Sequence, residues 1–481
     1  ARLPEHFFQR ILPVPVQKPD LIYLNHDLLE ELGLRPDSFH GENGSSIFSG
    51  NLIPNGAEPI ALAYAGHQFG HFVPQLGDGR AVLLGEISDL RGKRRDIQLK
   101  GSGKTAFSRS GDGRAALGPV MREYILSEAM HALGIPTNRA LALVATGENV
   151  VRENILPGAI LTRIASSHVR VGTFEFFASR NDVKAIKLLA DYVIDRLYPS
   201  IKGTVNPYLA LIECVLDAQV QLIASWMHVG FIHGVMNTDN MAISGETIDY
   251  GPCAFMDTYD PMTVFSSIDQ FGRYAYSNQS KVGQWNLASL AECLLPVLDE
   301  DEKKGLSIVR EIIDGFSSKF SAVWLEGMTS KLGLIPSPAG DAVLVQKLLD
   351  LMQKHEADYT SVFRLLCDAV HPGSNVEGLT NIFSGDLLWV NWLELWRKKL
   401  EMGKRTLEQV AQGMRSVNPA FIPRNHLVEQ AISSAVEKND FSAMYTMQKL
   451  LSTPYLDQPS YQKYMDPPKK EERIFKTFCG T

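Results

Sequence analysis

Hydrophobic and polar residues follow different periods in different parts of this 481-residue chain. Between residues 60 and 160, several segments alternate apolar and polar positions, which is the period of a β-strand with one buried face. These segments are 81–87, 95–100 and 140–151, the last with a turn at Gly147. The segment 119–134 instead carries apolar residues at helical spacing, so this region predicts a small α/β lobe.

Helical spacing dominates beyond about residue 162. Four long segments repeat apolar residues every three or four positions: 182–201, 207–230, 287–320 and 342–370. Short apolar runs mixed with turns indicate an extended wrapping segment at the start of the chain. We therefore divide the chain into a wrapping extension at 1–59, a lobe at 60–160, a helical region at 161–400, and a C-terminal helical extension with a cysteine-containing tail at 401–481.

Composition narrows the class of protein. The chain is 45% hydrophobic and 21% charged, as ordinary globular proteins with a large core are. A net charge of -7 without a long Lys/Arg run argues against a nucleic-acid partner, and we expect no membrane partner. We expect a soluble cytoplasmic protein, or a mitochondrial one if this is a eukaryotic mature form. The five cysteines lack a CxxC pair, which argues against zinc and a disulfide framework.

Candidate chemistry lies in HGVMNTDN at 233–240, followed by DYG at 249–251. Its outer residues have the spacing of the kinase pattern HRDxxxxN and its metal-binding DFG. Val235, however, stands where a kinase has its catalytic aspartate. Asn240 and Asp249 offer oxygen ligands of the kind that Mg²⁺ prefers, although each residue alone could simply cap a loop. The motif therefore predicts two metal ligands without the usual catalytic base.

Lys100 ends the strand predicted at 95–100, and Glu123 lies in the helix that follows. In kinase folds, a helix glutamate orients a strand lysine toward the nucleotide phosphates. Either residue alone is typical of a solvated surface. The prediction depends on the order along the chain, which is strand lysine, helix glutamate, loop asparagine and metal aspartate, as in kinases. Gly103, Lys104 and Thr105 resemble the end of a P-loop, but Gln98 stands where that motif needs glycine.

Two further features suit phosphate oxygens. The string GDGRA occurs at 77–81 and again at 111–115. A DG turn leaves backbone N–H groups free and the arginine adds donors, although exposed hairpin turns are the simpler interpretation. Arg163 and Arg170 could clamp a terminal phosphate or could be ordinary surface arginines.

Together these residues resemble the selenoprotein O family, kinase-like proteins that transfer AMP to protein hydroxyls. Long strings carry the resemblance, among them AGHQFGHFVPQLGDGRAVLLGE, DIQLKGSGKTAFSRSGDGRAAL, LTRIASSHVRVGTFE and HGVMNTDNMAISGETIDYGP. The resemblance runs from LPEHFF near the start to the last residues. It implies an α+β, bilobal protein-kinase-like fold with a small α/β N-lobe, a larger mostly helical C-lobe, and extensions at both ends.

The resemblance also implies roles for individual residues. Lys100 and Glu123 would form an ion pair, Asn240 and Asp249 would hold Mg²⁺ or Mn²⁺, and Asp239 would accept the proton of the incoming hydroxyl. The implied ATP contacts are Gly77, Gly79, Arg80, Lys100, Asp112, Gly113, Arg163, Arg170 and Asp249. Family members bind ATP reversed, with the α-phosphate facing the acceptor, which accounts for Val235.

The implied partners are ATP and proteins that present Ser, Thr or Tyr hydroxyls. UMP transfer with Mn²⁺ is also compatible with the resemblance, and so is a monomer. Cys479 stands where some family members carry selenocysteine, although the chain ends in CGT rather than CSS. A tail thiol could form a regulatory disulfide, for which Cys253 is the first partner to test, or could stay unpaired.

Two other functions stay open. One is a conventional γ-phosphoryl kinase, and the other is a catalytically inactive pseudokinase scaffold. Val235 argues against the kinase, because the catalytic aspartate is missing. The complete set of Lys100, Glu123, Asn240 and Asp249 argues against the scaffold, which needs no metal and phosphate ligands.

Overall fold

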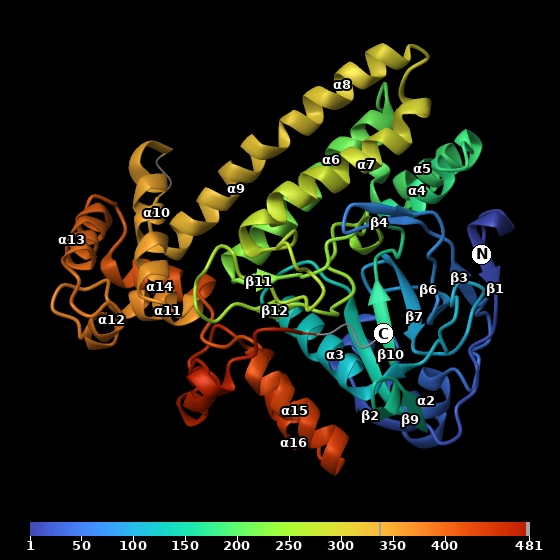
Figure 1. Ribbon diagram of the computed structural model, residues 1–481, viewed down its shortest axis with the longest axis horizontal. Helices are drawn as coiled ribbons and strands as arrows, with labels where there is room; N and C mark the ends of the chain where they lie inside the picture. The colour runs from blue at the N-terminus through green and yellow to red at the C-terminus, as the bar shows by residue number, and fades with distance from the viewer. Residues whose placement is uncertain (336–337, 478–481) are drawn as a thin grey trace.

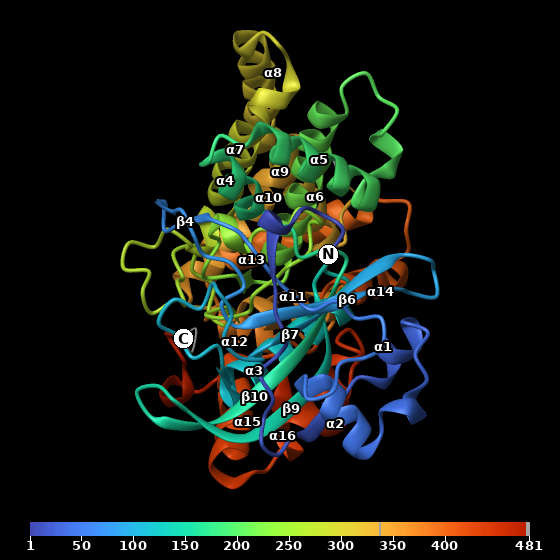
Figure 2. The ribbon, with the colours of Figure 1, turned by 90° about the vertical axis from the view of Figure 1, so that its right-hand side faces the viewer.

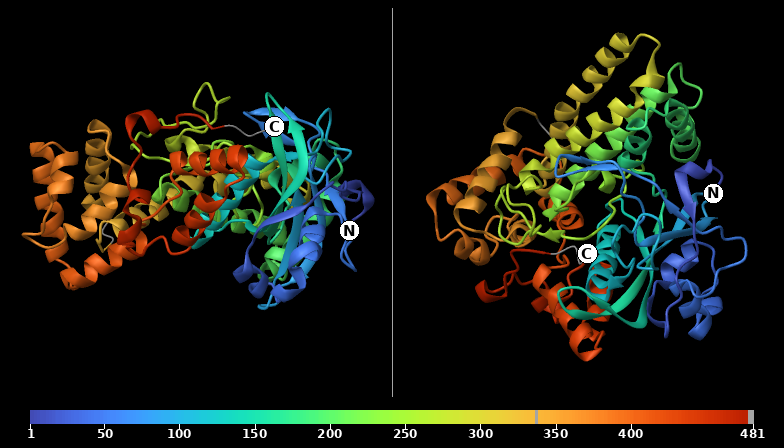
Figure 3. Two further views of the ribbon diagram at one scale, coloured as in Figure 1. Left: turned by 90° about the horizontal axis from the view of Figure 1, so that it is seen from below. Right: turned by 45° about the vertical axis from the view of Figure 1, so that its right-hand side comes forward.

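The protein has a mixed α/β architecture. A computed structural model describes residues 1–335 and 338–477. The main sheet lies within residues 8–165, and a larger helical part continues from it (Figure 1). Viewed from below, the sheet stands at one end of the molecule and the helices of residues 338–417 stand at the other (Figure 3). The expected change from strands to helices near residue 162 is confirmed.

In the described residues, the main sheet has eight strands whose pairs run antiparallel. A short strand, β8 (Ala115–Ala116), pairs with β10 outside the main path. The spatial order is β1 (Phe8–Arg10), β3 (Ile60–Leu62), β6 (Ala81–Ser88), β7 (Arg94–Lys100), β10 (Ile155–Ala165), β9 (Arg139–Val151) and β2 (Asp20–Leu24).

The strand β7 shows why the sheet can carry chemistry. Side chains alternate across a strand, so Leu99 joins a small apolar cluster on one face. On the other face, Asp96, Gln98 and Lys100 are all buried. Buried polar groups need partners, so this face must meet other polar side chains rather than solvent.

The turn expected at Gly147 is wrong, because β9 runs through this position. Gly147 has a φ of +71°, and a Cβ there would lie 2.7 Å from Cβ of Lys18. The glycine therefore serves a close approach of the N-terminal segment rather than a chain reversal. The chain reverses at residues 152–154, between β9 and β10.

The N-terminal extension is more regular than expected. It supplies β1 and β2, the two ends of the strand order, and two helices, α1 (His26–Glu31) and α2 (Gly41–Ser49). Asn25 caps α1 by accepting from the N–H of Leu28 at 3.1 Å. The segment therefore adds two strands to the sheet and two helices beside it.

A single long helix, α3 (Leu117–Ala132), covers one face of the sheet. Its apolar residues pack with those of β9 and β10 and with two C-terminal helices, α15 (Asn425–Lys438) and α16 (Ser442–Leu451). Figure 2 shows these helices behind the strands. The C-terminal extension thus buries the outer side of the helix that carries Glu123.

The helical part follows β10. Its helices are α4 (Val171–Ala178), α5 (Val183–Leu197), α6 (Pro207–His228), α7 (Gln279–Leu298), α8 (Glu302–Asp314), α9 (Phe316–Lys331), α10 (Pro338–Lys354), α11 (Tyr359–Asp368), α12 (Glu377–Ile382), α13 (Leu387–Glu401) and α14 (Leu407–Val417). By length and composition α6 is apolar enough to cross a membrane, and 56% of its most apolar window is buried inside the protein. Such burial is typical of a core helix.

Four short elements lie between α6 and α7: β11 (Phe231–Ile232), the 3₁₀ helix η4 (Thr238–Asn240), β12 (Ala254–Phe255) and the 3₁₀ helix η5 (Tyr276–Asn278). The motif residues 233–251 lie between β11 and β12. β11 and β12 pair as a small antiparallel sheet. The tail returns to this region, where Thr477 forms a bridge with Ser266 and its hydroxyl donates to the carbonyl of Pro252 at 2.5 Å.

Candidate active site

Lys100 stands at the centre of a buried charged cluster. Its Nζ lies 2.6 Å from Oε2 of Glu123 and 2.9 Å from Oδ1 of Asp249. Glu123 comes from α3, and Asp249 comes from the loop between η4 and β12. The cluster therefore links the sheet, its covering helix and the loop that follows α6.

A second cation, Arg163 of β10, serves the same two carboxylates. It donates to Glu123 and, at 3.3 Å, to Oδ1 of Asp249. Burial alone would raise the pKa of Glu123, but the charges of Arg163 and Lys100 hold that pKa below its usual range. The glutamate is therefore ionised and fixes both cations.

Asp249 is the most perturbed carboxyl of the cluster. Burial would raise its pKa, yet Lys100, Arg163 and Arg80 hold that pKa well below the usual range. Its backbone has a φ of +64°, in the left-handed region that few residues other than glycine adopt. Strained backbone of this kind concentrates at functional sites, and here it directs an ionised carboxylate at two cations.

The loop before Asp249 is held by its histidine. His233 is fully buried, and its Nε2 lies 2.9 Å from the carbonyl oxygen of Ile248, next to Asp249. Asn240 donates its side-chain N–H to the carbonyl of Val235 at 3.0 Å, which leaves the amide oxygen as the free end of that side chain. The two outer motif residues thus fix the loop at both ends.

Asp239 occupies the middle of this loop with a nearly buried carboxyl, which is 8% exposed as a residue. Burial raises its pKa to about 6, with Arg170 opposing the shift. Gln68 donates to Oδ2 at 3.3 Å, while Oδ1 is buried with no hydrogen-bond partner among the described residues. A buried acceptor left open in this way is suited to receive a proton from a bound group.

Arg170 joins Asp239 to the sheet side of the site. It donates to the backbone carbonyl of Asp239 at 3.0 Å, and its guanidinium lies 4.4 Å from the ring centroid of Tyr64. Its Nη2 is 3.7 Å from Oδ1 of Asp78. Both Arg163 and Arg170 are buried, so the simpler interpretation of surface arginines is wrong for these two residues.

The first GDGR string forms a tight turn before β6. Cβ atoms added at Gly77 or Gly79 would lie 2.3 Å and 2.8 Å from atoms of Phe107, so glycine is required for this packing. Thr105 donates to the carbonyl of Asp78 at 2.7 Å, and Ser108 donates to that of Gly79. The loop after β7 thus covers the turn that carries Arg80.

The second GDGR string has a different setting. Asp112 forms an ion pair with Arg152 at 2.8 Å, and its side chain is 45% exposed. Arg114 donates to the carbonyls of Val14 and Pro15. Gly113 packs on Gly103, whose carbon and oxygen would lie 2.2 Å from an added Cβ. Arg114 therefore holds the N-terminal segment in place, and its position differs from that of Arg80.

Two buried polar residues, Asp78 and Gln98, complete the cluster although neither was predicted as a site residue. Gln98 donates to Asp78 at 3.1 Å and accepts from Arg163 at 3.3 Å, so it joins the turn to the cation. Burial raises the pKa of Asp78 against the charge of Arg170. A signal for Asp78 does exist, because an aspartate separates the two glycines of each GDGR string.

The side chains of Asn240 and Asp249 carry oxygens of the kind that Mg²⁺ prefers. No group of three or more His, Cys, Asp or Glu side chains in the described part of the chain could hold a metal by itself. Mg²⁺ is usually held by one or two carboxylates together with substrate phosphates, so a site with one amide oxygen and one carboxylate has donors of the right kind. The donor set is thus compatible with Mg²⁺ and does not suit zinc.

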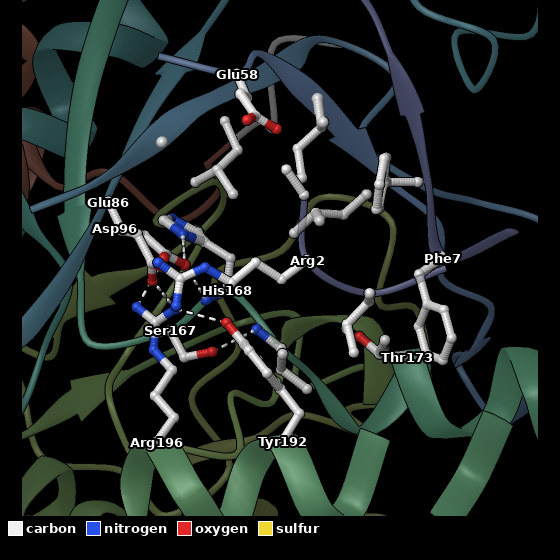
Figure 4. Close-up of a pocket in the computed structure, with 18 of the residues that line it drawn as sticks. Arg2, Phe7, Glu58, Glu86, Asp96, Ser167, His168, Thr173, Tyr192 and Arg196 are labelled. Atoms are coloured by element: carbon white, nitrogen blue, oxygen red, sulfur yellow. Dashed lines mark hydrogen bonds and ion pairs between the residues drawn. The ribbon is translucent and has the colours of Figure 1, made fainter. Parts of the chain in front are cut away.

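A separate cavity of about 250 Å³ lies at the other end of β7, between the N-terminal segment and α5 (Figure 4). Within it, Asp96 contacts Nδ1 of His168 at 3.1 Å and Arg196 at 2.6 Å. Its described lining residues include none of the predicted site residues. The polar face of β7 therefore runs from the Lys100 cluster to a second, distinct polar group.

A buried strand lysine with a helix glutamate, beside an Asp and an Asn suited to Mg²⁺, is typical of enzymes that transfer phosphate-containing groups from nucleotides. The family described as "Protein adenylyltransferase SelO" matches residues 1–452. The chain belongs to this family. It is also 57% identical over 481 residues to a protein nucleotidyltransferase YdiU from Rhizobium meliloti (strain 1021), covering all of this chain and 98% of the relative. A protein of the same name from Bradyrhizobium sp. (strain BTAi1 / ATCC BAA-1182) is 55% identical with the same coverage.

Proposed function

We propose that the protein transfers AMP from ATP to Ser, Thr or Tyr hydroxyls of other proteins and releases pyrophosphate. Membership of the adenylyltransferase family supports this reaction, and so do the relatives named protein nucleotidyltransferase. The observation that carries the proposal is the position of Asp239. Its open Oδ1 supplies the carboxylate that the loop lacks at Val235.

In the proposed reaction, the acceptor hydroxyl oxygen attacks the α-phosphorus while the bond from that phosphorus to the bridging oxygen breaks. The hydroxyl proton passes to the carboxylate of Asp239, and pyrophosphate leaves with the bonding electrons. Mg²⁺ held by Asn240 and Asp249 would neutralise charge on the phosphates. Mn²⁺ in its place, with UMP transfer, is part of the proposal.

The cations account for the proposed nucleotide direction. Arg163 and Arg170 are buried between the sheet and the loop, so they would bind a terminal phosphate deep in the site. Lys100 and Arg80 would contact the other phosphates beside Asp249. Gly77 and Gly79 would let the backbone approach the nucleotide, as would Gly113 with its neighbour Asp112. The α-phosphate then faces the acceptor.

The fold supports a bilobal, protein-kinase-like arrangement. β7, α3 and the loop of η4 follow one another in the order strand lysine, helix glutamate, catalytic loop and metal aspartate. The sequence divides the chain into domains at 1–59, 60–160, 161–400 and 401–481. Because β10 ends at Ala165, we place the boundary between the second and third domains at that residue.

The position of the transferred label tests the proposal. ATP labelled at the α-phosphate should label protein substrates or the protein itself, and ATP labelled at the γ-phosphate should not. Transfer of γ label alone would establish a conventional kinase, and transfer of neither label would favour a scaffold. Asp239→Ala should slow α transfer by about 10²–10⁴-fold and leave ATP binding intact. Loss of ATP binding in this variant would exclude Asp239 as the base.

A further inference from the structure

A short hairpin lies across the loop that carries Asp239. It consists of β4 (Gly66–Gln68) and β5 (His71–Val73), joined by Phe69 and Gly70 at φ of +51° and +84°. Positive φ at both positions is typical of a type I′ turn. The hairpin lies in the connection between β3 and β6, which are neighbours in the main sheet.

Three consecutive hairpin residues bond to three consecutive loop residues. The N–H of His67 donates to Oγ1 of Thr238 at 2.7 Å, and the N–H of Phe69 donates to Oδ1 of Asn237 at 3.1 Å. Between them, Gln68 donates to Asp239. The hairpin therefore contacts every residue from Asn237 to Asp239.

Two glycines allow the hairpin to pack closely against the loop and α4. A Cβ at Gly66 would lie 2.9 Å from Oδ1 of Asp239, and one at Gly172 would lie 2.2 Å from the carbonyl oxygen of Ala65. The open carboxylate oxygen therefore faces the hairpin backbone directly. A small shift of the hairpin would displace the carboxyl of Asp239.

Glu175 of α4 holds the hairpin and the loop together. Glu175 is 3% exposed, and each of its carboxylate oxygens has one hydrogen-bond partner. Oε1 lies 2.6 Å from Nδ1 of His67, and Oε2 accepts from the hydroxyl of Thr238 at 2.5 Å. One buried carboxylate thus fixes the residue before Gln68 and the residue before Asp239.

We propose that Glu175 is a positioning residue for Asp239, acting through His67 and Thr238. Glu175 itself touches no reacting atom in this scheme. Charge-assisted hydrogen bonds are stronger than neutral ones, so a carboxylate that accepts from both partners holds them at fixed distances. This proposal rests on the proposed role of Asp239 as the base.

Glu175→Gln is the sharpest variant, because it preserves size but removes the negative charge that strengthens both hydrogen bonds. At saturating ATP, kcat for α-phosphate transfer should fall by about 10–100-fold, as expected for a small displacement of a catalytic group. KM for ATP should stay within about twofold, because the phosphate-binding cations are untouched. Thr238→Val should repeat the fall, and Thr238→Ser should largely restore the rate.

Glu128→Gln is a matched control. Glu128 is another well-buried carboxylate, paired with Arg139 at 2.8 Å, on the part of α3 that faces β9. This variant should lower Tm, as Glu175→Gln does, but leave kcat unchanged. An unchanged kcat in Glu175→Gln, or a change confined to KM for ATP, would overturn the positioning role.

Hydrogen–deuterium exchange separates this proposal from the proposed function. Amides of Asn237–Asn240 should exchange at least about tenfold faster in Glu175→Gln than in the wild type, with or without ATP. A wild type without α transfer would refute the reaction, and the exchange rates would still decide whether Glu175 orders the loop. Equal exchange in the two proteins would refute the positioning role even where transfer is normal.

Discussion

Lys100 and Asp249 lie 2.9 Å apart although 149 positions separate them in the chain. The lysine comes from the sheet and the aspartate from the loop after α6, so this contact exists only when the two parts of the protein have come together. Both groups are largely removed from water, where an unpaired charge is costly. The contact therefore couples the assembly of the fold to the assembly of the site.

Asp249→Asn should abolish metal-dependent transfer. The variant removes an ionised carboxylate that also balances Lys100 and Arg163, so we expect a loss of at least about 10²-fold in kcat. Transfer measured against Mg²⁺ and Mn²⁺ concentration tests this expectation. Asp191→Asn, at an exposed pair with Lys187, is the control. A normal rate with a normal metal dependence would remove Asp249 from the mechanism.

Glu123→Gln should impair both folding and ATP use. Two buried cations would lose an ionised partner, and removing one member of a buried pair costs about 3–5 kcal/mol. Denaturant unfolding should report this loss. The kinetic effect should be a higher KM for ATP, because Lys100 and Arg163 would lose the carboxylate that orients them toward the proposed phosphate positions. An unchanged KM in protein that is fully folded would contradict this assignment.

Lys331→Met should raise Tm at neutral pH. Lys331 is 3% exposed and lies 4.2 Å from the ring centroid of Phe363, with no carboxylate at ion-pair distance among the described residues. Burial lowers the pKa of Lys331 to about 7, whereas the unfolded chain retains the ordinary value near 10.5. At or below about pH 7 the native state must bury a charge, so the substitution should gain about 0.5–2 kcal/mol.

The pH dependence gives this prediction its sign. Between about pH 7 and 10.5 the unfolded state binds the proton and the native state does not, so wild-type stability rises with pH in that window. The advantage of Lys331→Met over the wild type should therefore be largest at pH 7 and shrink toward pH 9. A constant difference in Tm would show that the buried amine does not titrate.

Cys253 should resist alkylation in the native protein. Its side chain is fully buried, and burial raises the pKa of the thiol to about 12. Thiolate is the reactive form, so labelling of Cys253 by iodoacetamide should require unfolding, whereas the half-buried Cys214 should react first. Peptide mapping after timed labelling distinguishes the two. Rapid labelling of Cys253 would contradict this expectation. Cys479, its predicted partner, lies outside the described residues.

The elements of this fold could be predicted better than their contacts. The alternating segments at 81–87 and 95–100 appear as β6 and β7, and the helix at 119–134 appears as α3, because local periodicity follows from burial on one face. The helices within 1–59 were not predicted, since short elements there contain many turn residues and depend on the sheet for burial.

Site residues could be predicted only where they belong to a recognisable sequence pattern. Lys100, Glu123 and Asp249 come together in the structure. Gln98 and Glu175 carry no local signal, because their partners lie 20 to 108 positions away in the chain. The repeated GDGR string shows the opposite problem. In the first string, the charge of Arg80 helps to lower the pKa of Asp249, whereas in the second Arg114 bonds to the N-terminal segment, because the surrounding chain differs.

The polar face of β7 makes the site depend on strand pairing as much as on side chains. Lys100 stands opposite Ala81 of β6 and Leu161 of β10, and Asp96 stands opposite Ala165. A shift of one residue in this pairing would turn Asp96, Gln98 and Lys100 toward the apolar layer at once. Insertions in the turn between β6 and β7 should therefore be tolerated only when they leave this alignment intact.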